Sequence, residues 1–96
     1  MLYAFSEKLE NTQCVFAVLA YRVTSQKYDL LYVGETTRPG NTLARHPKKD
    51  AWLMASATHV FAHPTHTTRE SRRKIARPII AEFDPPFNNN EHTGAA

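Results

Sequence analysis

The residues best suited to chemistry in this sequence are cations, which gather between residues 36 and 78. This stretch holds nine cationic and two acidic side chains, a net charge of +7, whereas three cationic and seven acidic side chains give the remainder −4. The cations are Arg38, Arg45, Lys48, Lys49, Arg69, Arg72, Arg73, Lys74 and Arg77. Packed together they would form a basic face that attracts phosphate backbones. In the alternative interpretation they only solvate helix surfaces.

Histidines offer a second kind of chemistry, because an imidazole can bind a metal ion or carry a proton. His59 and His63 share one face of a predicted strand, and His66 follows three residues later. Such a group could hold zinc, but a chain with a single cysteine is not expected to build a closed zinc site. His46, beside Arg45, is the histidine expected nearest to a cleft, or else it faces solvent at a helix end.

Apolar runs bounded by turn signals predict the elements that position these residues. The valine-rich and aromatic-rich run 14–23 and the shorter run 28–34 predict two strands of an antiparallel hairpin. A short helical turn at 42–45 and a helix at 48–55, anchored in the core by its tryptophan, are expected next. Alternation of apolar and polar residues over 58–63 predicts a third strand.

A final helix is expected from Thr67-Thr68-Arg69-Glu70, where threonine and glutamate three positions apart form the pattern of a capping box. Pro78 lies inside the helical pattern and is expected to kink or split the helix, leaving residues 79–83 as a second piece. Asp84-Pro85-Pro86 then ends it. Because helices must bury their apolar stripes on a sheet, the element order predicts a small α/β (α+β) fold.

Length and composition fit one small domain in a chain of 96 residues. We expect a three-stranded antiparallel sheet flanked by helices over residues 14–88, an N-terminal extension at 1–13 and a disordered tail at 89–96. A lone cysteine fits a reducing compartment, and no apolar run approaches the length of a membrane span. The sequence therefore predicts a soluble, cytoplasmic protein that has no membrane partner.

Several short motifs resemble those of the GIY-YIG nucleases. Tyr32-Val33-Gly34, which closes the second predicted strand, is similar to the YIG half of that signature, and Cys14-Val15-Phe16 stands at the place of the GIY half. Arg45 matches an arginine on the first helix, and Pro85-Pro86-Phe87-Asn88 resembles the terminal Pro-x-(Tyr/Phe)-Asn after an apolar helix. The resemblance spans about three-quarters of the chain and implies the GIY-YIG fold.

This resemblance implies metal-dependent hydrolysis of a nucleic-acid phosphodiester. Tyr32 would help to activate water, Arg45 would neutralise the phosphoryl charge, and a glutamate would hold Mg²⁺ or Mn²⁺. His46 and Asn88 would lie around the phosphate as further catalytic candidates. Phosphoryl transfer depends mainly on positioning and cationic stabilisation, so such a set is chemically reasonable. The expected substrate contacts are Gly34, Arg38, Lys48, Lys49, Arg72 and Arg73.

Two departures from the family pattern leave catalysis open. Phe16 keeps the ring of the GIY tyrosine but lacks its hydroxyl group, and Ala76 stands at the position expected to carry the metal-binding glutamate. Glu70, six residues earlier, is the candidate metal ligand, although it could instead cap its helix. Glu35 could also substitute, or be a solvated loop acid. Tyr32 could simply be a core aromatic residue, and comparable structural roles exist for the other candidates.

Three functions therefore compete. The first is a metal-dependent endonuclease, the second is a nucleic-acid-binding module that has lost catalysis, and the third is a protein-interaction domain with a basic face. DNA is expected as the nucleic-acid partner more than RNA, and a protein partner could supply specificity. The sequence identifies neither a recognition helix nor a stacking platform that would read bases.

Overall fold

The computed structural model describes residues 2–7, 9 and 12–88 of the chain. Its strands are β1 (Leu2–Ala4), β2 (Cys14–Arg22), β3 (Lys27–Thr36) and β4 (His59–Pro64). They form one antiparallel sheet in the order β1-β4-β2-β3, so that β1 and β3 are its edges. The small α+β fold with an antiparallel sheet is therefore as the sequence predicts.

The predicted hairpin is confirmed as β2 and β3, which pair along their whole length. The partners run from Cys14 opposite Thr36 to Arg22 opposite Lys27, with one irregularity near Val18 that leaves Leu31 as an extra residue in β3. The strand continues two residues beyond Gly34, the predicted end. Glu35 is consequently a strand residue with a fixed direction, not a loop acid.

The predicted count of three strands is wrong by one, because β1 comes from the segment expected to be an N-terminal extension. Leu2, Tyr3 and Ala4 pair with Phe61, Val60 and His59 of β4. Leu9, in the same segment, is buried in the core. A three-residue strand has too little periodicity to be identified from sequence. The expected tail, residues 89–96, lies outside the described residues.

Two short helices, α1 (Pro39–Arg45) and α2 (Lys49–Met54), follow the hairpin. The first begins three residues earlier than the predicted helical turn, because Pro39 takes the first helical position that proline suits. The second confirms the predicted helix, and its Trp52 is completely buried. Within the described part of the chain, no helix is long and apolar enough to cross a membrane.

The long helix α3 (Arg69–Phe83) corrects two expectations. Thr68, not Thr67, is the N-cap, and its hydroxyl accepts from the Ser71 N–H at 3.2 Å, so Glu70 is no partner in a capping box. Pro78 does not split the helix, which runs on to an αL residue, Asp84, as its C-cap. Pro78 is exposed, and apolar residues on either side of it hold the helix against the sheet.

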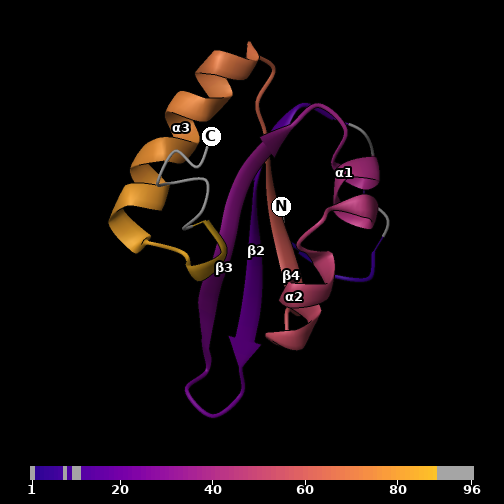
Figure 1. The fold of residues 1–96 in the computed structure, drawn as a ribbon, viewed down its shortest axis with the longest axis vertical. Helices are drawn as coiled ribbons and strands as arrows, with labels where there is room; N and C mark the ends of the chain where they lie inside the picture. The colour runs from indigo at the N-terminus through magenta and orange to yellow at the C-terminus, as the bar shows by residue number, and fades with distance from the viewer. Residues whose placement is uncertain (1, 8, 10–11, 89–96) are drawn as a thin grey trace.

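The sheet is sandwiched between unequal layers, with α1 and α2 on one side and α3 on the other (Figure 1). The larger core lies under α1 and α2, where Phe16, Val18, Tyr32, Trp52 and Val60 pack together. The smaller core joins α3 to the opposite face of β2 and β3. It consists of Val15, Val33 and Ala76, with Ala17, Leu30, Ile79 and Ile80 packed against them.

Candidate functional site

The candidate residues gather at the C-terminal end of β3 but on its two opposite faces. Side chains alternate along a strand, so Tyr32 and Gly34 face α1 and α2 whereas Val33 and Glu35 face α3. The structure therefore divides the predicted site into an aromatic cluster on one face and an arginine cluster on the other. Tyr32 does not converge with the carboxylate that lies three residues after it.

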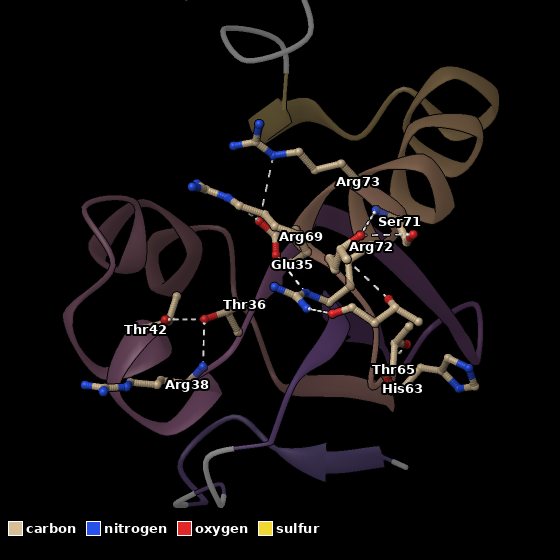
Figure 2. Close-up of polar contacts among 12 residues, drawn as sticks. Glu35, Thr36, Arg38, Thr42, His63, Thr65, Arg69, Ser71, Arg72 and Arg73 are labelled. Carbon is tan, nitrogen blue, oxygen red and sulfur yellow. Dashed lines mark hydrogen bonds and ion pairs between the residues drawn. The ribbon is translucent and has the colours of Figure 1, made fainter.

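The arginine cluster consists of Glu35 and three arginines from the first turns of α3 (Figure 2). One carboxylate oxygen of Glu35 accepts from Arg72 Nε at 3.0 Å. The other accepts from Arg69 Nε at 3.2 Å and lies 3.8 Å from Arg73 Nε. One carboxylate thus faces three guanidinium groups, which leaves the cluster with two uncompensated positive charges.

Burial separates the members of this cluster into two kinds. The side chains of Arg72 and Glu35 are only 3% and 11% exposed, whereas those of Arg69 and Arg73 are 69% and 51% exposed. Arg72 Nη1 also donates to the Thr67 carbonyl just before the helix, so its guanidinium is held within the fold by two partners. Arg72 and Glu35 form the structural base, and Arg69 and Arg73 present their charge to solvent.

Cys14 lies on β2 opposite Thr36, close to this charged pair. Burial raises the pKa of the Cys14 thiol above its ordinary value, while the positive charge of Arg72 acts in the opposite direction and Glu35 adds to the increase. The thiol therefore stays protonated at neutral pH and packs as a small apolar group of the core.

The aromatic cluster surrounds Tyr32, which is 5% exposed. Its ring lies 5.1 Å from the Trp52 ring and 5.3 Å from the His46 ring, and Lys48 Nζ is 5.1 Å from its centre. His46 Nδ1 accepts from the Lys48 N–H at 3.1 Å, and Lys48 Nζ donates to the Phe87 carbonyl. Tyr32, His46 and Lys48 are thus brought together within a tightly packed cluster.

Gly34 has a steric explanation in this cluster. A Cβ at this position would lie 2.8 Å from the Phe16 ring and 2.9 Å from the Tyr32 ring, closer than real Cβ contacts. The rings of Phe16 and Tyr32 lie 5.9 Å apart and close over the glycine. The Tyr-Val-Gly motif is therefore accounted for by packing, in addition to any contact with a substrate.

Asn88 holds the exposed edge of the sheet. Its side-chain oxygen accepts from the Val33 N–H at 2.8 Å, and its side-chain nitrogen donates to the Val33 carbonyl at 2.9 Å. The short 3₁₀ helix η1 (Pro86–Asn88) places this amide, which is 1% exposed, against β3. Asn88 therefore imitates the backbone of a further strand at the edge where β3 lacks one.

Replacing Asn88 by alanine is expected to lower the free energy of unfolding by about 2 kcal/mol, because two buried backbone groups of Val33 lose their partner. Asn88→Asp should be destabilised near neutral pH and recover as the pH falls. Its carboxylate can accept from Val33 but cannot donate until it is protonated. Urea unfolding at several pH values measures both effects. Equal stability of the two variants at every pH would contradict this role.

The predicted phosphate contacts on α1 and α2 lie apart from the arginine cluster. The Arg38 N–H donates to the Thr36 hydroxyl at 3.0 Å, which in turn contacts the Thr42 hydroxyl at 2.7 Å, and the Arg38 side chain points away from Glu35 in Figure 2. Arg45 and Lys49 line a separate hollow between the helices and the segment after β1, about 560 Å³ in volume. Arg38, Arg45 and Lys49 therefore do not belong to the arginine cluster.

The metal ion implied by the GIY-YIG resemblance does not fit the residues that the structure describes. Glu70, the predicted ligand, has a side chain 78% exposed and lies 3.9 Å from Lys74 in a helical ion pair. Ala76, at the position of the family glutamate, is buried between Val15 and Val33. Both carboxylate oxygens of Glu35 face arginines, whose charges disfavour a divalent cation. The residues described here form no group of three or more potential metal ligands.

The link between Glu35 and α3 is the feature that the sequence analysis missed. The sequence predicts only a metal ligand or a loop acid at Glu35, because 34 residues separate it from Arg69. The charge pattern contained a partial signal, since Arg69, Arg72 and Arg73 recur at spacings that place them along one side of a helix. Pairing them with one carboxylate required the tertiary structure.

Comparison with known proteins gives no further assignment. No protein-family model matches the chain, and neither the curated proteins nor the solved structures contain a match.

Proposed function

We propose that this domain binds nucleic acid through the phosphate backbone, as a binding module on a GIY-YIG-like scaffold. The observation that carries the proposal is the pair of uncompensated charges in the arginine cluster. The buried pair of Arg72 and Glu35 positions the cluster. The exposed guanidinium groups of Arg69 and Arg73 can then bind phosphate oxygens. Arginine suits this task because its planar fork can bind two phosphate oxygens at once.

Binding without hydrolysis is the form of the proposal that the side chains support best. A nuclease of the expected type needs a carboxylate that holds a divalent cation beside Tyr32. Glu35 lies on the opposite face of β3 from Tyr32, and Glu70 points to solvent beside Lys74. Cations alone stabilise a bound phosphate but give a weak route to its hydrolysis.

The test is fluorescence anisotropy with labelled oligonucleotides, single-stranded and duplex, at salt concentrations from 50 to 200 mM. The double variant Arg69→Gln/Arg73→Gln is expected to bind about tenfold more weakly at low salt. The slope of log affinity against log salt should become shallower by about 2, because each lost phosphate contact removes about one released counterion.

The matched control is Lys27→Gln, which removes an exposed cation at the start of β3, at the opposite end of this strand from Glu35. It should leave both affinity and slope close to those of the wild type. Salt-independent binding, or a slope unchanged in the double variant, would overturn the assignment. Cleavage of supercoiled plasmid that requires Mg²⁺ or Mn²⁺ and is lost in Glu70→Ala and Tyr32→Phe would establish the nuclease alternative instead.

A further inference from the structure

In the part of the chain that the structure describes, the face of the sheet that carries α3 is only half covered. The helix α3 packs on β3 and β2. The neighbouring strands β4 and β1 are left open on this face. Phe61 of β4 is 44% exposed and Leu2, its partner on β1, is 49% exposed. An apolar groove of about 200 Å³ runs between β4 and α3, with Ile75 and Ile79 on the helix side and Phe61 and His63 on the sheet side.

Ring-bearing side chains line this open half. His59, Phe61 and His63 alternate along β4 on this face, at intervals of about 7 Å. Tyr28 of β3 continues the line, because this residue is 44% exposed and its ring lies 5.3 Å from the His59 ring. The Tyr21 ring of β2 lies 4.9 Å from the Tyr28 ring. We call Tyr28, His59, Phe61 and His63 the aromatic strip.

Positive charge lies near the His63 end of the aromatic strip, because Val15 of β2 pairs with His63 on one side and with Glu35, the centre of the arginine cluster, on the other. The helix α3, which forms the other wall of the groove, carries five cationic and two acidic residues. At one end, the His63 carbonyl accepts from the Thr65 hydroxyl at 3.0 Å, and the chain then passes directly to the arginine cluster (Figure 2). Stacking surfaces beside a basic groove are how proteins hold unpaired bases while tracking the sugar-phosphate chain.

We propose that the aromatic strip stacks the unpaired bases of a single-stranded nucleic acid whose phosphates reach the arginine cluster. This inference rests on the proposed phosphate binding and adds the strandedness of the ligand. The charge of α3 and the exposed rings favour a polyanion with flat apolar groups over an apolar protein segment. A base in a duplex is already paired and stacked, so the strip cannot use it, and single strands must bind more tightly than duplexes of the same sequence.

The experiment measures anisotropy for one sequence as single-stranded RNA, single-stranded DNA and duplex DNA, with wild type, Phe61→Ala and Phe61→Trp. Phe61→Ala is expected to weaken binding of the single strands about tenfold and to leave duplex binding unchanged. The RNA and DNA arms show which single strand is preferred. Leu53→Ala is the matched control, since Leu53 is 49% exposed on α2, across the sheet.

Phe61→Trp supplies a readout that a merely structural role would not affect. This variant keeps a large ring, so it should retain single-strand binding, and its new indole fluorescence should be quenched when bases stack on it. The native Trp52 is completely buried on the other side of the sheet, so the wild type gives the constant background.

The outcomes separate this inference from the one on which it rests. Salt-sensitive binding that is equal for single strands and duplex, and unchanged by Phe61→Ala, would overturn the aromatic strip and keep the phosphate site. Absence of all nucleic-acid binding would overturn both. A wild-type dimer that becomes a monomer in Phe61→Ala, measured by sedimentation, would show that a second copy covers this face and would overturn the strip.

Discussion

Replacing Glu35 by glutamine is expected to lower the free energy of unfolding by about 3 kcal/mol, because it leaves a buried guanidinium without its counter-charge. Arg72 is 3% exposed and is held in place by Glu35 and by the Thr67 carbonyl. Glutamine has nearly the same shape as glutamate, so the change tests charge with little change in packing. Urea unfolding followed by circular dichroism measures the loss.

Two companion variants sharpen this experiment. Glu70→Gln removes the carboxylate of an exposed helical pair and should change stability by less than about 0.5 kcal/mol. Glu35→Gln/Arg72→Met removes both buried charges and should recover part of the loss, because an apolar side chain replaces a buried ion pair at little net cost. A Glu35→Gln protein as stable as the wild type, but impaired in binding or cleavage, would mean that Glu35 acts on the ligand instead.

Truncating Trp52 to alanine should have the largest effect, a loss of about 4 kcal/mol in the free energy of unfolding. The side chain is completely buried, and the rings of Phe5, Tyr32 and His46 all pack on it. A domain of this size has a free energy of unfolding of about 5–15 kcal/mol in total, so this loss removes between about a quarter and about four-fifths of it. Chemical and thermal unfolding both report this loss.

Trp52→Phe separates the volume of the side chain from its polar atom. In the described part of the structure, Trp52 Nε1 is buried without a hydrogen-bond partner. Phenylalanine therefore loses contact area but no hydrogen bond, and should cost much less than alanine. The neighbouring Leu53→Ala, half exposed on the same helix, should change stability by less than about 1 kcal/mol. Equal losses for Trp52→Phe and Trp52→Ala would indicate a hydrogen bond at Nε1.

Local patterns in the sequence determined most of the elements. The hairpin of β2 and β3 follows from two apolar runs with a short polar connection, and β4 follows from alternation. Trp52 was identifiable as a core residue because its large apolar ring is the main group that a short helix can bury. The charge imbalance between residues 36 and 78 also required only counting.

Tertiary packing decided what local patterns could not. β1 exists because Leu2–Ala4 can complete the hydrogen bonds of β4, and a three-residue segment carries no period of its own. Pro78 stays inside α3 because apolar contacts with β2 and β3 outweigh the one helical hydrogen bond that proline forfeits.

The division of the candidate site has the same origin. The sequence identified Tyr32, Glu35 and Asn88 as candidate site residues. The role of each one depends on the residues that the tertiary structure places next to it. Because side chains alternate along a strand, Tyr32 and Glu35 lie on opposite faces of β3. Tyr32 packs against Trp52 on one face, and Glu35 pairs with Arg72 on the other. Asn88 reaches the backbone of Val33 across 55 residues. Such pairings depend on distances in space, which a single sequence does not encode locally.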